Sequence, residues 1–234
     1  MRSLTLSMVL MGSFFLVGCG GGSSSKSQVN TATTVQEAEK NYEALYALDS
    51  LNEIFGDDPT LQKSKLIQKS EGEDFCAGGG SLSMPLYSEN EIKIVFDKCV
   101  DDGTYLDGTF WVRFSDNEQH YYTDLKDVTI KDAEVSLYSS HLVIEEDDIE
   151  QWTTIDGDMK ITTQCASNSY EIKTLEKIYN AQDGSDNAER GILKINGATY
   201  TFDNPYVTIQ VGDEQQRVLQ SSLDAGYDDT EECS

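Results

Sequence analysis

Thiols, imidazoles and carboxylates are the side chains of this 234-residue chain that could do chemistry. No two of its five cysteines form a C-x-x-C pair and only two histidines exist, which argues against a structural zinc site. The histidines, His120 and His141, stand in neither an H-E-x-x-H nor a G-x-S-x-G pattern. We expect both to be surface or strand-end residues, with His141 opening a strand, rather than general bases or metal ligands. The sequence therefore nominates no catalytic residue and no cofactor.

The 42 Asp and Glu residues allow two other kinds of site. Hydrolysis of a glycan needs only two carboxylates, so a hydrolase is not excluded, but no motif nominates a pair. Asp183, Ser185 and Asn187 place oxygen donors at positions 1, 3 and 5 of a loop that begins like an EF-hand. Positions 6 and 12 are Ala188 and Lys194 instead of glycine and glutamate. We interpret the loop as a solvated hairpin turn and as a weak calcium candidate only.

Cys19 ends an apolar N-terminal run. Arg2 supplies a positive charge and Leu4 to Val17 supply an apolar segment of signal-peptide length. A membrane-spanning helix would need about 20 apolar residues, and this run is interrupted by Ser7 and then gives way to glycines and serines after Cys19. The pattern favours a cleaved leader over an uncleaved anchor.

The residues Leu16-Val17-Gly18-Cys19 resemble the lipobox of bacterial lipoprotein precursors. The resemblance implies that residues 1–18 are a signal peptide and that Cys19 carries fatty acids such as palmitate. Residues 19–33 are then a flexible tether to the membrane. By similarity to Gram-negative sorting patterns, glycine rather than aspartate at position 20 points to the outer membrane. The expected location is the cell envelope, facing the periplasm or the surface.

Lipidation of Cys19 would leave four cysteines for disulfides: Cys76, Cys99, Cys165 and Cys233. An even number in an exported chain predicts two disulfides with three possible connectivities. We favour Cys76 with Cys99, because a separation of 23 residues suits two neighbouring antiparallel strands. Cys165 would then pair with Cys233 and hold the acidic C-terminal tail.

The chain is strongly acidic, with a formal net charge of −25. Removal of residues 1–18 takes away one arginine and no acid, which makes the charge −26. Such a field repels phosphate backbones, so nucleic acid is excluded as a partner, and anionic headgroups would push the domain toward water. Solubility explains the acidity most simply; a cationic partner or calcium is the alternative.

One amphipathic helix is predicted at the N-terminus of the domain. Thr34 and Glu37 have the spacing of a capping box. Apolar residues then recur at three- and four-residue steps up to Phe55, and Gly56 stops the pattern. We expect a helix over 35–55 that packs on a sheet rather than entering lipid.

Alternation with a period of two follows along the chain from Ile92 to Val211. Asp-Gly and Asn-Gly turn signals separate the alternating segments. This pattern predicts a mainly β fold, an antiparallel meander that forms one large curved sheet or an incomplete barrel, in a single domain over 34–234. Gly108, Gly157 and Gly191 each open an alternating segment at unequal spacings, which argues against a solenoid.

The stretch from Ile92 through Phe114 is similar to uncharacterised β-rich bacterial lipoproteins. It covers about a tenth of the chain, and the similarity implies no chemistry.

Three functions remain open. The first is a structural or interaction lipoprotein that contacts an envelope partner. The second is a carrier of lipid or another apolar ligand, by fold analogy with periplasmic lipoprotein carriers such as LolA and LolB. Five aromatic residues could line its cavity, although ordinary core packing also explains them: Phe110, Trp111, Trp152, Tyr170 and Phe202. The third is the carboxylate-based glycan hydrolase.

Overall fold

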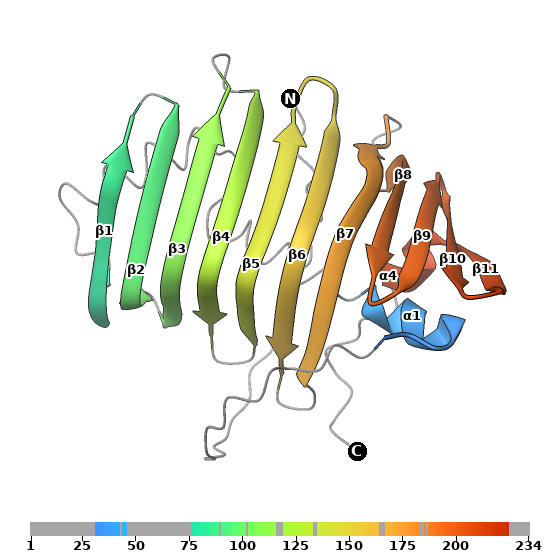
Figure 1. The fold of residues 1–234 in the computed structure, drawn as a ribbon, viewed down its shortest axis with the longest axis horizontal. Helices are drawn as coiled ribbons and strands as arrows, with labels where there is room; N and C mark the ends of the chain where they lie inside the picture. The colour runs from blue at the N-terminus through green and yellow to red at the C-terminus, as the bar shows by residue number, and fades with distance from the viewer. Residues whose placement is uncertain are drawn as a thin grey trace.

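The computed structural model describes residues 31–42, 44–45, 76–88, 90–101, 103–115, 119–132, 135–163, 167–182, 185 and 187–224. Eleven strands form one antiparallel sheet, in which each strand pairs only with its neighbours in the sequence (Figure 1). The strands are β1 (Gly79–Tyr87), β2 (Glu91–Asp101), β3 (Thr104–Phe114), β4 (His120–Lys131), β5 (Ser136–Asp147), β6 (Trp152–Thr162), β7 (Ser167–Asn180), β8 (Ala188–Ile195), β9 (Ala198–Asp203), β10 (Tyr206–Val211) and β11 (Glu214–Leu219). The sheet is open, because β1 and β11 lie at its opposite ends. This confirms the predicted meander.

The two faces of the sheet differ because successive side chains point to opposite sides of a strand. The inner face carries the buried core, against which α1 (Val35–Asn41) packs at the β10 end. A cross-strand row from β2 to β9 shows its apolar character: Ile94, Phe110, Leu125, Leu142, Gly157, Ile172, Ile195 and Ala198. The adjacent row on the outer face is polar and charged: Lys93, Trp111, Asp124, Val143, Asp156, Lys173, Lys194 and Thr199.

Glycines inside strands let neighbouring strands approach closely. Gly108 has φ +111°, and a Cβ there would lie 2.4 Å from the backbone oxygen of Asp127. Gly157 has φ +148°, and its Cβ would lie 2.2 Å from the backbone oxygen of His141. The pairing register shifts beside both glycines, between Asp107 and Thr109 and between Tyr138 and Leu142, so each faces an irregularity in the next strand.

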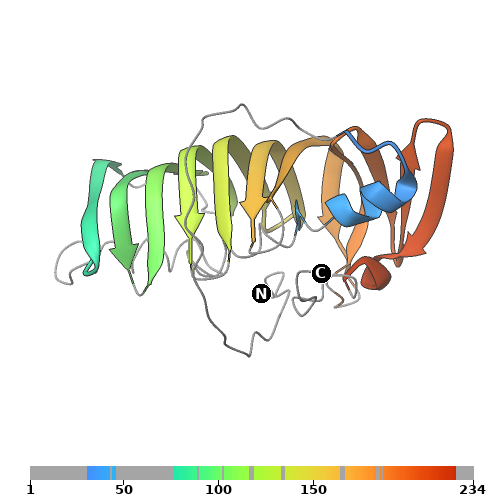
Figure 2. The same ribbon diagram turned by 90° about the horizontal axis from the view of Figure 1, so that it is seen from below.

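These glycines, with Gly191, were expected to open strands. Gly108 and Gly157 lie in the middle of β3 and β6, and Gly191 lies within β8. Bulges of this kind bend a strand and increase its twist, so these glycines favour curvature of the sheet, which Figure 2 shows from below.

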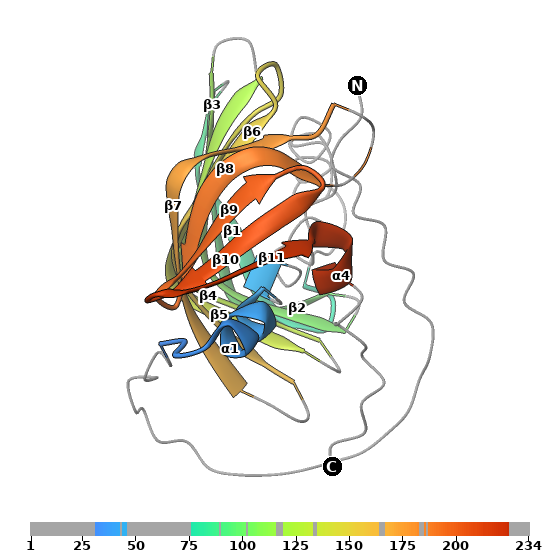
Figure 3. The same cartoon turned by 90° about the vertical axis from the view of Figure 1, so that its right-hand side faces the viewer.

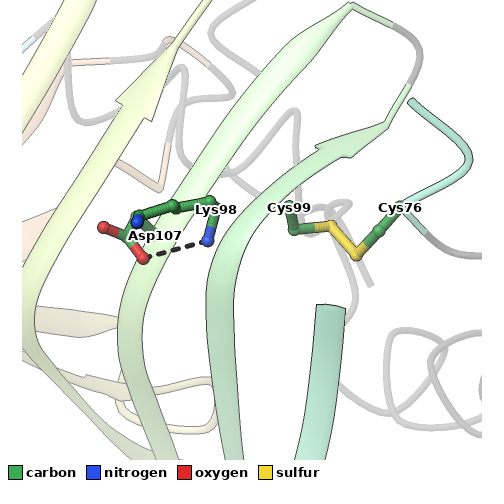
Figure 4. Close-up of a disulfide and its surroundings, with 4 residues drawn as sticks. All are labelled: Cys76, Lys98, Cys99 and Asp107. Carbon is green, nitrogen blue, oxygen red and sulfur yellow. Dashed lines mark hydrogen bonds between the residues drawn. A yellow bond between two sulfur atoms is a disulfide. The ribbon is translucent and has the colours of Figure 1, made fainter. Parts of the chain in front are cut away.

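The predicted disulfide between Cys76 and Cys99 is present, with a Cα–Cα distance of 4.8 Å (Figure 4). It joins the turn before β1 to β2 and is buried at both ends. Next to it Lys98 has φ +51°, and its backbone N–H donates to Asp107 Oδ1 at 3.1 Å. The register between β2 and β3 is irregular at Lys98, so its N–H lies outside the regular strand pairing, and the Asp107 carboxylate of β3 accepts from it instead.

The N-terminal helix begins where the sequence predicts. The hydroxyl of Thr34 accepts the Glu37 N–H at 3.2 Å, while the Glu37 carboxylate accepts from the N–H and hydroxyl of Thr33. α1 ends at Asn41, and Ala44 and Leu45 are also helical. The rest of the predicted 35–55 helix lies outside the described residues.

α1 lies on the inner side of the C-terminal strands (Figure 3). Its buried residues Val35 and Ala38 face the core. The Tyr200 hydroxyl donates to the backbone oxygen of Ala38, and the Tyr42 ring lies 5.9 Å from the Tyr200 ring. Burial raises the pKa of Tyr200 above its ordinary value. The helix therefore packs on the sheet, as expected, at the β10 and β11 end of the inner face.

A short helix, α4 (Gln220–Asp224), follows β11. The side chain of Gln220 is buried, accepts the Ala188 N–H at 2.9 Å, and donates to the backbone oxygens of Ala188 and Tyr206. One amide thus connects the end of β11 to the starts of β8 and β10.

Candidate functional site

Three of the five candidate cavity residues lie on the inner face. Phe110, Tyr170 and Phe202 are at most 4% exposed. Phe110 meets the ring of Phe96 edge-on at 5.3 Å, and Phe202 lies 6.5 Å from the ring of Tyr42. Each ring is therefore packed among core residues.

Trp111 lies on the outer face, because it follows Phe110 directly in β3. It stands opposite Lys93 of β2, and its indole N–H donates to Glu91 Oε1 at 2.6 Å. Trp152 also lies on the outer face. The structure thus divides the five residues between two sides of the sheet, and the alternation of β3 is the sequence signal that separates Phe110 from Trp111.

A buried hydroxyl interrupts the apolar inner face. Ser139 stands opposite Val128 and is fully buried, and its Oγ finds no hydrogen-bond partner. A buried hydroxyl without a partner costs roughly 1–3 kcal/mol.

Glu146 and Asp148 form an acidic pair at the end of β5. Glu146 is only partly exposed and lies on the inner side between Tyr121 and Thr153. Burial, together with the nearby Asp148 charge, raises the pKa of Glu146 to about 7. Asp148 accepts the Tyr121 hydroxyl at 2.9 Å, and Glu146 is hydrogen-bonded to Thr153. Both carboxylates therefore have structural partners. Glu146 has the raised pKa that a general acid needs, but the site indicates no reaction for it.

On the outer face, cations lie on aromatic rings. The Arg113 guanidinium lies 4.8 Å from the centre of Trp111 and 4.1 Å from the centre of Tyr122. A guanidinium stacked on two rings keeps a fixed plane. The neighbouring Glu91 carboxylate is engaged by Trp111.

One cross-strand row, the outer rim row, continues this chemistry along the end of the sheet from β4 to β11. Its members are His120, Asp147, Trp152, Tyr179, Arg190, Asp203, Tyr206 and Leu219. Arg190 stacks on Tyr179 at 4.1 Å. Arg217 stacks on Tyr206 at 4.2 Å and pairs with Asp203 at 2.8 Å. The row therefore presents aromatic rings covered by cations at the rim of an acidic protein.

Trp152 is the most enclosed member of the row, at 4% exposure. Lys177 Nζ lies 3.4 Å from the ring centre, the His120 ring lies 5.3 Å away, and the indole N–H donates to Glu150 Oε2 at 3.1 Å. His120 Nε2 is buried with no hydrogen-bond partner. His120 begins β4, as a strand-end residue should.

The second histidine lies inside β5 rather than at its start. His141 Nε2 is 3.2 Å from Asp124 Oδ1, close enough for an ion pair when the imidazole is protonated, although no hydrogen bond forms there. The His141 side chain is 59% exposed, so this pair contributes little.

The candidate calcium loop is described in part. Asp183 lies outside the described residues. The Asn187 side chain donates to Asn204 Oδ1 at 3.1 Å, which connects the start of β8 to the turn after β9. In the described part of the chain no three His, Cys, Asp or Glu side chains gather as metal ligands would.

Cys19, Cys165 and Cys233 lie outside the described residues, as do residues 1–30 and the C-terminal tail over 225–234. Within the described ranges, no helix combines the length and the apolar character needed to cross a membrane.

Sequence reasoning did not find the outer rim row. Its members come from eight strands and become neighbours only through the pairing register. The one local signal is that each lies within two residues of a strand end. No protein-family model matches this chain, and no match was found among the curated proteins or the solved structures.

Proposed function

We propose that this protein is a lipid-anchored envelope protein that acts as an interaction module through the outer face of its sheet. The lipobox-like residues around Cys19 support the anchor. The outer rim row supports the interaction.

The observation that carries the proposal is the composition of that row. Tyr, Trp and Arg are the residues enriched in the energetically dominant parts of protein interfaces. In a chain with a net charge of −25, the Arg190 guanidinium stacks on the Tyr179 ring at 4.1 Å. A cation held in this way is already ordered, so a partner pays little side-chain entropy to bind it.

The test is cross-linking in native envelopes with two charge-reversal variants of β8. Arg190→Glu changes the outer rim row, and Lys194→Glu changes an exposed outer-face cation of the same strand four residues away. The expected result is a cross-linked product that Arg190→Glu loses and Lys194→Glu keeps. Equal yields from the two variants would remove the outer rim row from the function.

The anchor has its own test. Mass spectrometry of the protein from native membranes should find a diacylglyceryl-modified Cys19 at the N-terminus, and Cys19→Ala should release the protein from membranes. An intact leader or a free thiol at this position would contradict the lipoprotein assignment.

The inner face favours a second candidate, a carrier of an apolar ligand. An apolar row runs across eight strands of an open sheet, and Ser139, opposite Val128 on the same face, adds an unpartnered hydroxyl. A carrier should bind an environment-sensitive fluorescent fatty acid saturably, with displacement by phospholipid. An absence of displaceable binding would leave the inner face as core.

A further inference from the structure

An open sheet has two edge strands, and the two edge strands of this sheet, β1 and β11, differ in regularity. Exposed edges invite pairing with another chain, and proteins protect them with proline, bulges or covering segments. β1 has such protection. It contains Pro85, its register with β2 shifts twice, and the Cys76–Cys99 disulfide ties its leading turn to β2.

Among the described residues, β11 has neither the proline nor the register shifts of β1. It pairs with β10 over six residue pairs without a shift and contains neither proline nor glycine. Glu214 to Arg217 and Leu219 are exposed. A regular, exposed edge strand is a template on which another strand can form.

The hairpin geometry identifies the free backbone groups. Gly212, with φ +58°, is the first of two turn residues, so Val211 and Glu214 close the turn as a hydrogen-bonded pair. Alternation along an antiparallel ladder then leaves the amides and carbonyls of Gln215 and Arg217, and the amide of Leu219, pointing away from β10. The Leu219 carbonyl accepts the Ser222 hydroxyl at 2.6 Å. The same alternation makes the Gln220 N–H point toward the β10 side, where it donates to the Pro205 oxygen at 3.0 Å.

The surroundings of β11 define the chemistry of an added strand. Glu39 of α1 lies on its inner side, where it accepts from Gln216 at 2.9 Å. Asp213 and Glu214 lie at its start. On its outer side Leu219 is 44% exposed, beside Tyr206 of the outer rim row at 37%. A second copy, also at −25, would be repelled, whereas a basic strand is attracted.

We propose that the β11 edge binds an extended, lysine- or arginine-rich segment of a partner protein as a twelfth strand. This rests on the proposed interaction function and specifies the partner of that surface. Main-chain hydrogen bonds to both backbone groups of Gln215 and Arg217 and to the Leu219 N–H hold the segment, and its outward side chains pack beside Tyr206 and Leu219.

The test uses the full chain, purified in detergent, and a fluorescein-labelled peptide of sequence Thr-Lys-Val-Lys-Val-Lys-Thr. Gln215→Pro removes one outward N–H and leaves the β10 ladder intact, because that N–H does not face β10. Gln215→Ala removes the same side chain and keeps the N–H. Urea unfolding midpoints of the two variants establish that both are folded.

Saturable binding to the wild type and to Gln215→Ala, weakened about tenfold by Gln215→Pro, is the expected result. A peptide with glutamate in place of each lysine should not bind. Three results would overturn the proposal: no binding of the basic peptide, equal binding by the proline and alanine variants, or a dimer of the full chain that Gln215→Pro dissociates. Loss of envelope cross-links in Arg190→Glu is measured separately, so failure at β11 is distinguishable from failure of the outer rim row.

Discussion

Replacement of Gly108 by alanine tests whether close approach between β3 and β4 determines the curvature of the sheet. The matched control is Gly103→Ala, in the turn between β2 and β3. Gly108 and Gly103 both have positive φ, +111° and +86°, so backbone strain should lower the stability by about 1–3 kcal/mol in each variant. Only Gly108 faces a neighbouring strand, since nothing lies within 4 Å of a Cβ at Gly103.

The additional cost at Gly108 follows from distances. A new Cβ would lie 2.4 Å from the Asp127 backbone oxygen and 2.7 Å from the Val128 Cα, whereas real Cβ atoms essentially never come within 3.0 Å of such atoms. The strands must therefore separate by about 0.6 Å, the difference between 3.0 and 2.4 Å. Overpacking of this kind costs about 1–3 kcal/mol. Both affected groups are backbone, so no side chain can move aside to relieve the contact.

Urea unfolding with the disulfide intact is the assay. With a slope of about 2 kcal/mol per molar urea, Gly108→Ala should lower the midpoint about 0.5–1.5 M further than Gly103→Ala. Equal midpoints would show that the strands relax without cost, and the argument that this glycine sets the curvature would fail.

Three further predictions concern buried groups. Burial raises the pKa of Glu146 to about 7 from 4.5, so the folded state binds more protons than the unfolded state between these values. Stability should therefore fall by up to roughly 3 kcal/mol as pH rises from 4.5 to 7. In urea titrations at pH 5 and 8, Glu146→Gln should remove much of this loss of stability. Glu145→Gln, on the outer face, is the control. If the loss of stability is unchanged in Glu146→Gln, other groups cause it. The double variant Cys76→Ser, Cys99→Ser should lose about 3 kcal/mol of unfolding free energy, because the disulfide closes a loop of 23 residues. Amide hydrogen exchange in β1 should also become faster. Unchanged exchange there would mean that the disulfide does not hold this edge strand in place. Ser139→Ala should stabilise the protein by about 1 kcal/mol, because it removes a buried hydroxyl without a partner; a loss of stability would reveal a partner that the geometry does not include.

The fold was predictable because its signals are local. Alternation with a period of two along β2 and β3 identifies strands, and short turn-rich connections leave antiparallel pairing of consecutive strands as the simplest arrangement. The Thr34 cap could be predicted because its partner, the Glu37 amide, is three residues away. The disulfide could be predicted because Cys76 and Cys99 flank a single hairpin.

The candidate surfaces were harder to predict, because their members are distant in the sequence. Assigning Trp111 and Trp152 to a cavity with Phe110 ignored the side of the sheet to which each points. For Trp111 the error was avoidable, because it is adjacent to Phe110. For Trp152 the register also mattered, because the shift between Thr153 and Asp156 changes how β6 meets β7.

The amino-acid sequence by itself did not predict β11. It determined the strands between Ile92 and Val211, their order, the inner and outer sides of β2 and β3, and one disulfide. Each of these depends on residues that are neighbours along the chain or across one turn. Only the tertiary structure decided that the repeated glycines lie inside strands and that Tyr179 meets Arg190 across a hairpin. It also decided that β1 pairs with two register shifts while β11 pairs without one. The physical reason is that, in a sheet of eleven strands, the position of each strand depends on the pairing registers of all the strands before it. Each bulge shifts every later side chain against its neighbour, so cross-strand contacts depend on all the turns together.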